Sequence, residues 1–306
     1  MRDTFAQAFY EEAQLNPKMF LVVADISPAS KISNFKQEFP TRFIDVGVAE
    51  QTMIGLAAGL ALRGCKPFAY TIANFSIYRP FEQVRNDLCY QNLPVTVVGM
   101  GAGITYSPLG ATHHTIEDVA VMSAIPNMSV LAPCDPAEVT EAVRVAARHA
   151  GPMYLRLGKA GEPNLTAEAA PFHFGKLRQI KSGGDTAILS YGPITKMAVD
   201  VAAKLESEQS RSTAVYSVHT LKPLDYEGIT AVLKRFSVVA VIEEHVERGG
   251  LGAQVKQVAW DSRATCKLHT FALKDAFLHV YGSQDDIRQA HGLSIDQIYP
   301  VIAANT

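Results

Sequence analysis

The chain of 306 residues is 48% hydrophobic and 19% charged, and its formal net charge at pH 7 is −2. This length suits about two ordinary domains, and the composition is typical of a well-buried globular protein, not a disordered one. The sequence has no basic stripe and no apolar run of the ~18–20 residues that a membrane span needs, so neither a nucleic-acid nor a membrane partner is expected.

The N-terminus has no apolar stretch of the kind that a secretory signal peptide contains. Four cysteines, Cys65, Cys89, Cys134 and Cys266, are scattered along the chain without a CxxC pair. Buried free thiols are therefore favoured over disulfides. These features together predict a cytoplasmic protein.

Short apolar runs alternate with helical patterns through the first half of the chain. The runs predict strands at 20–24, 67–70, 95–99, 129–132 and 153–157, and the pattern at 136–150 predicts a helix. Continuous apolar strands separated by amphipathic helices indicate a parallel sheet that is covered on both faces.

The run 159–176 contains glycines and prolines without periodicity, which is typical of a linker. A second α/β unit follows, with strands predicted at 186–191, 214–218 and 238–243 and a helix at 194–206. The expected fold class is therefore α/β, with two parallel-sheet domains. We expect a first domain at 1–165, a linker at 166–176 and a second domain at 177–306.

Two glycine-rich segments precede regular elements. Residues 249–252 could cradle a phosphate at a helix start, but they lack the GxGxxG and GxxxxGK[ST] spacings. A tight strand-to-helix turn is the favoured interpretation. Residues 183–185 likewise predict a turn before a strand.

The most informative segment surrounds Glu50. A short β-type run at 43–46 reaches a glycine turn, and Glu50 then begins an apolar stretch rich in alanine and glycine. A carboxylate with apolar neighbours is poorly solvated, and proteins keep such a group when it must meet one specific partner. The plainer alternative is a glutamate in the first turn of a helix, where the helix dipole favours it.

Two further segments follow, 70–87 around Phe75 and 101–118 with the pair His113-His114. In order and spacing, the three segments resemble the pyrimidine-binding half of transketolase, in the form whose enzyme is divided between two polypeptides. The resemblance covers essentially the whole chain, since the remainder is similar to that family's C-terminal domain. It implies a pyrimidine-binding thiamin-fold domain followed by a transketolase C-terminal-like domain.

The resemblance implies roles for residues around a thiamin diphosphate cofactor. Glu50 matches the glutamate that hydrogen-bonds the pyrimidine ring and switches on acid–base catalysis by the cofactor. Phe75 matches the aromatic side chain that stacks on this ring, and Ile72 and Tyr78 share its face at i−3 and i+3. Asp25 matches an aspartate near the cofactor at the subunit contact, although an Asp that caps the following turn is an equal alternative.

His113 matches the family's substrate-facing histidine, which would be catalytic and would hydrogen-bond a substrate oxygen. The adjacent His114 is interpreted only as a helix-start residue. Adjacent histidines do not converge on one ion, and no other ligand stands at zinc spacing, so no metal site is expected in this chain.

The positions that read the substrate differ from those of sugar-phosphate transketolases. Arg2 matches a phosphate-contacting arginine, and Lys159 stands where that family has another arginine. Where the family has a serine, a histidine and an aspartate, this chain has Ala29, Gly101 and Leu109. We therefore expect His113, Arg2 and Lys159 to bind substrate, in a pocket less committed to a phosphorylated ketose.

The sequence contains no Gly-Asp-Gly motif, which in that family helps to hold Mg²⁺ against the diphosphate. The resemblance implies a partner, an N-terminal transketolase subunit that carries the diphosphate and Mg²⁺ site and shares the thiamin diphosphate. Self-association would give an α2β2 assembly. The implied reaction moves a two-carbon ketol unit from a ketose to an aldehyde.

Three alternatives remain open at this point. The β subunit of a 2-oxo acid dehydrogenase E1 shares the fold, but residues 112–118 followed by 125–128 favour transketolase. A deoxyxylulose-phosphate synthase-like enzyme normally carries its diphosphate domain in the same chain. A non-catalytic regulatory paralogue is suggested by the changed phosphate contacts.

Overall fold

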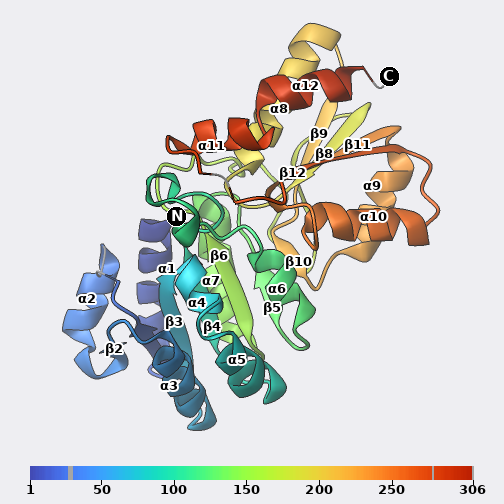
Figure 1. The fold of residues 1–306 in the computed structure, drawn as a ribbon. Helices are drawn as coiled ribbons and strands as arrows, with labels where there is room; N and C mark the ends of the chain where they lie inside the picture. Colours follow the sequence, from blue (N-terminus) through green and yellow to red (C-terminus); the bar gives the residue numbers. More distant parts are fainter. Residues whose placement is uncertain (27–29, 278, 305–306) are drawn as a thin grey trace.

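The computed structural model describes residues 1–26, 30–277 and 279–304, and it consists of two α/β units that meet along one side (Figure 1). Ala29, one of the predicted substrate-site differences, lies outside the described residues. The predicted fold class, two α/β domains with mainly parallel sheets, is confirmed. The predicted domain bounds stay a prediction.

Within the described residues, seven strands form the first sheet in the order β10-β5-β6-β4-β3-β1-β2. Every neighbouring pair is parallel except β10 with β5. The strands are β1 (Met19–Val23), β2 (Phe43–Asp45), β3 (Lys66–Ile72), β4 (Thr96–Met100), β5 (Ser129–Leu131), β6 (Met153–Leu157) and β10 (Thr220–Lys222).

Helices cover both faces of this sheet (Figure 1). The large aromatic residues of the first helix pack on one face, where Phe5 and Phe9 contact the strand residue Phe68. The helical elements of this unit are α1 (Arg2–Leu15), α2 (Lys31–Glu38), α3 (Glu50–Leu62), α4 (Ala73–Ile77), α5 (Phe81–Gln83), the π-helix η2 (Val84–Tyr90), α6 (Asp118–Ala124) and α7 (Pro136–Arg148), with short 3₁₀ turns η1 (Pro40–Arg42), η3 (Ser107–Leu109) and η4 (Ala111–His113).

The second sheet has the order β12-β11-β8-β9-β7 in the part of the chain that the structure describes, with β7 antiparallel to β9 and the other pairs parallel. Its strands are β7 (Arg178–Lys181), β8 (Thr186–Ser190), β9 (Thr213–Ser217), β11 (Val238–Val246) and β12 (Lys267–Leu273). Its helices are α8 (Thr195–Gln209), α9 (Tyr226–Arg235), α10 (Leu251–Asp261), α11 (Gln284–His291) and α12 (Ile295–Ala303).

The two units share structure at their junction. Strand β10 comes after β9 in sequence, yet it pairs antiparallel with β5 and so extends the first sheet. The Lys222 ammonium donates to the carbonyl oxygens of Ser123 and Ile125 at 2.8 and 2.5 Å. One apolar core, which includes Val119, Val130 and Leu251, runs through both units.

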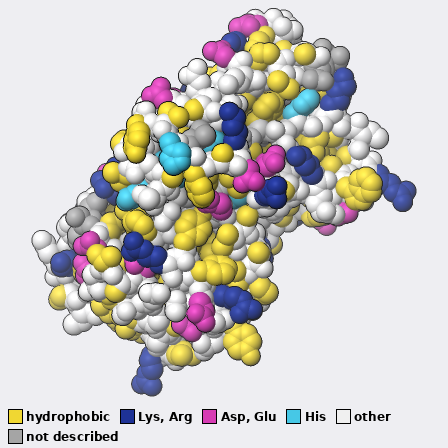
Figure 2. Space-filling view, viewed as in Figure 1, with side chains coloured by type: hydrophobic (Ala, Val, Ile, Leu, Met, Phe, Trp, Pro, Cys, Tyr) yellow, Lys and Arg dark blue, Asp and Glu magenta, His cyan; other side chains and the backbone are white. Residues whose placement is uncertain are grey.

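Charged side chains of both signs are interspersed with apolar ones on the face shown in Figure 2. This distribution agrees with the net charge of −2 and gives the visible face no basic belt. Among the described residues, no helix is long and apolar enough to cross a bilayer. All four cysteines are free thiols, and Cys89 and Cys134 are buried.

The completely buried Asp135 caps the start of helix α7 and also anchors the chain where it leaves the first unit. Its Oδ1 accepts from the Glu138 N–H at 2.8 Å, as an N-cap does. Its Oδ2 accepts from the backbone N–H groups of Leu165 and Thr166 at 2.8 Å and from the Thr166 hydroxyl at 2.7 Å. One carboxylate thus satisfies four donors.

Asp135→Ala should lower the free energy of unfolding by about 2–4 kcal/mol. This exceeds the ~0.5–2 kcal/mol of an ordinary N-cap because the partly buried donor of Leu165 and the buried donors of Thr166 also lose their acceptor. The matched control is Ser283→Ala in the exposed capping box of α11, which should cost about 1 kcal/mol or less. Equal losses for both variants in urea unfolding would contradict the anchoring role of Asp135.

Candidate functional site

The predicted site residues follow strands of the first sheet at one edge. Because β1, β2, β3, β4 and β6 are mutually parallel, their carboxyl ends meet there, and ligands of open α/β sheets bind outside this edge. In chain order, the residues after these strands are Asp25, Glu50, the Ile72–Tyr78 segment, His113 and Lys159.

Glu50 is the first residue of α3 and is only 5% exposed. Its two carboxylate oxygens lie 3.0 and 3.1 Å from Nη1 of Arg79, which sequence analysis did not single out. The Arg79 side chain is 50% exposed, so the ion pair joins a buried carboxylate to a half-exposed cation. Glu50 is thus as poorly exposed as predicted, and the partner that it meets within this chain is Arg79.

The Phe75 ring on α4 lies beside the same ion pair. The Arg79 guanidinium carbon is 4.4 Å from its ring centroid, a cation–π distance. The imidazole of His113 meets the same ring edge-on, with centroids 5.2 Å apart. Glu50, Phe75, Arg79 and His113 therefore form one cluster. Arg79 follows Phe75 by four residues, and this i,i+4 spacing was the signal that could have identified it.

Ile72, the last residue of β3, and Tyr78, just after α4, flank Phe75 and are half-buried; the face that they were predicted to share with Phe75 stays a prediction. The Tyr78 hydroxyl donates to Oε2 of Glu117 at 2.7 Å, and burial together with the carboxylates of Asp118 and Glu117 raises its pKa. Tyr78 is thereby tied to the loop after β4, and it lines a hollow of about 320 Å³ there together with His114.

Asp25 lies just beyond β1 in a left-handed backbone conformation, with φ 44°, and is exposed. Its backbone N–H donates to Oδ1 of Asp45, at the end of the neighbouring strand β2. The same oxygen accepts from the Gly47 N–H at 2.9 Å, so Asp45 ties together the two loops that carry Asp25 and Glu50.

The two adjacent histidines have different environments. His113 ends η4, is half-buried, and its Nδ1 lies 3.0 Å from the Thr112 hydroxyl. His114 is buried, and burial lowers its pKa. It follows η4, so its interpretation as a helix-start residue is wrong; the next helix begins at Asp118. No group of three His, Cys, Asp or Glu side chains in the described residues could hold a metal ion.

Arg2 and Lys159, predicted to bind substrate, lie next to each other. The Arg2 N–H donates to the Lys159 carbonyl at 3.1 Å, and the Arg2 Nε is buried without a hydrogen-bond partner in the described part of the chain. The Lys159 ammonium lies 4.8 Å from the ring centroid of Tyr106, and this ring is also 6.4 Å from that of His113. Tyr106 thus links Lys159 to the Phe75 cluster.

Tyr106 lies against Gly101, one of the predicted differences from sugar-phosphate transketolases. Gly101 has φ 69°, and a Cβ added there would lie 2.2 Å from Cε2 of Tyr106. A histidine at this position would therefore displace the Tyr106 ring and strain the backbone. Leu109, another predicted difference, is 51% exposed.

The second unit holds the loop that carries His113. Glu244, near the end of β11, accepts from the Ile104 N–H at 2.9 Å and forms an ion pair with Arg288 of α11 at 2.6 Å. A Cβ at Gly103 would lie 2.1 Å from Oε1 of Glu244, so only glycine permits this approach. The Val246 N–H donates to the Ile116 carbonyl at 2.9 Å.

A buried ion pair fixes the other end of this loop. The Arg156 Nε donates to Oδ2 of Asp118 at 2.8 Å, and the Tyr154 hydroxyl donates to the same oxygen at 2.9 Å. Arg156 Nη2 reaches the backbone carbonyl of Glu244 at 3.1 Å. The position of His113 therefore depends on buried charges in both units.

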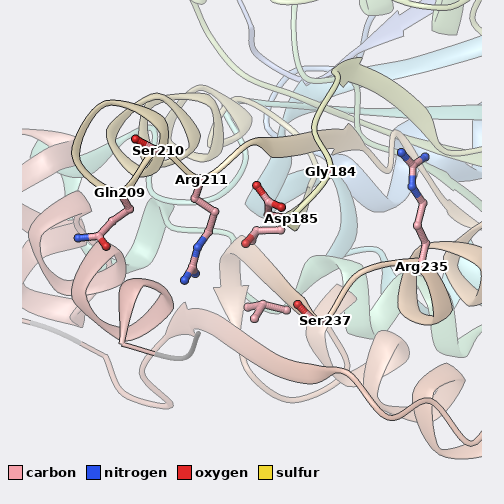
Figure 3. A pocket seen from close by; sticks show the side chains of 9 residues that line it. Gly184, Asp185, Gln209, Ser210, Arg211, Arg235 and Ser237 are labelled. Atoms are coloured by element: carbon pink, nitrogen blue, oxygen red, sulfur yellow. The ribbon is translucent and has the colours of Figure 1, made fainter.

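Two other regions lie away from this cluster. At residues 249–252, the Glu243 carboxylate accepts from the N–H groups of Leu251 and Gly252 at 2.7 and 2.8 Å. The N–H groups at this helix start are therefore already bonded to a carboxylate of the chain itself. This agrees with the predicted tight turn and leaves these groups unavailable to a phosphate. A hollow of about 500 Å³ lies near Asp185, Arg211 and Arg235, at the amino ends of β8 and β11 (Figure 3).

Comparison with known proteins agrees with this architecture. The family model for the transketolase pyrimidine-binding domain matches residues 1–162, and that for the transketolase C-terminal domain matches residues 175–298. One subunit of the apulose-4-phosphate transketolase of Actinobacillus succinogenes is 35% identical, over 90% of this chain and 89% of that protein. The 6-deoxy-6-sulfo-D-fructose transketolase subunit SqwH of a Clostridium species is 34% identical, over 97% of this chain and 92% of that protein.

Two solved structures show the same fold. A split-gene transketolase, described as an inactive beta4 tetramer, has a TM-score of 0.89 and 34% identity, covering 99% of this chain and 97% of that one. The transketolase of Campylobacter jejuni, 18% identical, has a TM-score of 0.77 and is covered to 46% of its length.

A further sequence relative is a longer protein. The 1-deoxy-D-xylulose-5-phosphate synthase of Alkaliphilus oremlandii is 34% identical, over 94% of this chain but only 46% of that protein.

The order of the two matched domains, pyrimidine-binding and then C-terminal, defines the class of protein: a subunit with the transketolase domain architecture. The chain belongs to the transketolase family, as a C-terminal subunit of the split form. This family implies the use of thiamin diphosphate, and the predicted resemblance is confirmed.

Glu244→Gln should lower the free energy of unfolding by up to about 3–5 kcal/mol, because the largely buried Arg288 loses its buried charge partner and keeps only the exposed Asp285. The control is Glu141→Gln, which breaks the exposed pair with Arg144 and should cost less than about 1 kcal/mol. Thermal and urea unfolding of both variants provide the test. Similar small losses would show that Glu244 does not fasten the loop to the second unit.

Proposed function

We propose that this chain supplies the pyrimidine side of a transketolase active site that transfers a two-carbon ketol unit from a ketose to an aldehyde. The observation that carries the proposal is the cluster around the Phe75 ring: the His113 imidazole contacts the ring, and the Arg79 guanidinium joins the ring to the buried Glu50 carboxylate. The cluster already accommodates a flat nitrogen-bearing group, the Arg79 guanidinium, between a carboxylate and an aromatic face. Thiamin diphosphate, when bound, supplies the nucleophilic carbon that carries the two-carbon unit.

Each residue has a distinct part in this proposal. Glu50 shares a proton with the pyrimidine ring nitrogen, and its low exposure keeps water from competing for that bond. Phe75 stacks on the ring, and Ile72 and Tyr78 border the same wall. His113 donates to, or accepts from, an oxygen of the substrate. Asp25, which is exposed at the sheet edge, belongs near the cofactor at the subunit contact.

A separate N-terminal subunit completes the site in this proposal. It holds the diphosphate and its Mg²⁺, a metal usually bound by one or two protein ligands together with phosphate oxygens. The relatives that are named subunits and match over most of their length support this division. The split-gene relative, an inactive tetramer of its β chains, supports the need for the partner and an α2β2 active assembly. Free cysteines favour a reducing compartment, the cytoplasm.

Glu50→Gln should lower kcat by about 10²–10⁴-fold in the complex reconstituted with the diphosphate-binding subunit, because glutamine cannot share a proton with the ring nitrogen. Folding should change little, since Glu50 pairs with a half-exposed arginine. The control is Glu82→Gln, an exposed glutamate nearby on α5. Steady-state kinetics with kcat within twofold of the wild type would remove Glu50 from this role.

Arg2 and Lys159 form the proposed anion site for the substrate. With Gly101 and Leu109 in place of polar groups, we expect phosphate to raise kcat/KM by less than about a thousandfold, since each charge-assisted hydrogen bond is worth ~1.5–3 kcal/mol. The measurement compares matched phosphorylated, sulfonated and neutral ketoses, then repeats the panel with Arg2→Ala and Lys159→Ala. Loss of anion preference in both variants supports the site. A larger phosphate preference, unaffected by either variant, contradicts it.

A further inference from the structure

Arg79 contacts both side chains on which the proposed cofactor site depends. Its Nη1 lies 3.0 and 3.1 Å from the two oxygens of Glu50, and its guanidinium carbon lies 4.4 Å from the centroid of Phe75. The guanidinium therefore takes up the carboxylate acceptors and the aromatic contact at the same time. Glu50 and Phe75 are the two partners assigned above to the pyrimidine ring.

A guanidinium and a protonated aminopyrimidine offer similar chemistry to such a pair. Both are flat, both carry N–H donors at the edge, and both bring positive charge to a carboxylate while they contact an aromatic ring. A carboxylate as little exposed as Glu50 would be costly without a partner. Arg79 supplies that partner from within the chain.

We propose that Arg79 is a further residue of the cofactor site: it holds Glu50 and Phe75 until the aminopyrimidine ring displaces it. This inference rests on the proposed function. Cofactor binding then exchanges one cationic partner of Glu50 for another. The measured affinity is lowered by the fraction of molecules in which Arg79 still holds the carboxylate.

The position of Arg79 allows this displacement. Its side chain is 50% exposed, and its backbone lies in the turn between α4, which ends at Ile77, and α5, which begins at Phe81. The guanidinium can therefore move into solvent without disturbing a helix or a buried core. The contacts that it leaves are an ion pair with one exposed partner and a cation–π contact, and both are individually weak.

The experiment measures thiamin diphosphate binding by calorimetry, with Mg²⁺, to the complex of this chain and its diphosphate-binding subunit. Arg79→Met keeps the apolar stem but removes the guanidinium, and it should bind the cofactor about 5–30-fold more tightly than the wild type. Arg79→Lys keeps the charge without the planar face and should fall between the two. The control is Arg85→Met, an exposed arginine six residues further along, which should stay within about twofold of the wild type.

A second readout is the melting temperature. Arg79→Met should lower the melting temperature of the isolated chain, because Glu50 loses its partner, but not that of the complex saturated with cofactor. Unchanged or weaker cofactor affinity in Arg79→Met would overturn this inference alone, since it would mean that Arg79 stays beside Glu50 and supports it. Failure of the wild-type complex to bind the cofactor would overturn the proposed function as well.

Discussion

The site depends on one constraint: the strands of the first sheet that lead into it run in the same direction. Parallel strands deliver all their following loops to one edge, so residues separated by more than a hundred positions meet there. Hydrogen bonds between neighbouring loops then fix their relative positions. The Val46 N–H bonds to the Val23 carbonyl, and the Ala102 N–H bonds to that of Leu157. Each loop supplies one chemical group, and no single loop could form the cluster alone.

The second unit contributes support to this edge. Glu244, together with the Arg156–Asp118 pair, secures both ends of the loop that carries His113. Buried charges are tolerated only with well-aligned partners, and the loss of one partner strongly lowers the free energy of unfolding. The loop therefore has one strongly preferred arrangement, whereas a loop held by apolar contacts alone could slide. The arrangement gives the C-terminal unit a physical role that does not require it to touch substrate.

Sequence patterns predicted the strands well because buried parallel strands are continuous apolar runs; the run 153–157 coincides with β6 (Met153–Leu157). The edge strand β10 was not predicted, since three residues carry no period and their pairing with β5 is decided by tertiary packing. The cluster of Glu50, Phe75 and His113 followed from a family resemblance, not from periodicity. Arg79 and Glu244 were missed because their partners are remote in sequence or across the junction, apart from the i,i+4 spacing of Phe75 and Arg79.

Two buried glutamates near helix starts show what distinguishes a structural carboxylate from one that can exchange partners. Glu243 accepts from two backbone N–H groups and from the Tyr191 hydroxyl, and all three donors are themselves buried. None of these donors can leave without unfolding part of α10 or the core. Glu50 instead has a side-chain partner that is half exposed and lies on a turn. Both carboxylates are satisfied, but only the partner of Glu50 can be replaced at low cost by an incoming group. A replaceable partner, more than burial itself, makes Glu50 suited to bind a cofactor.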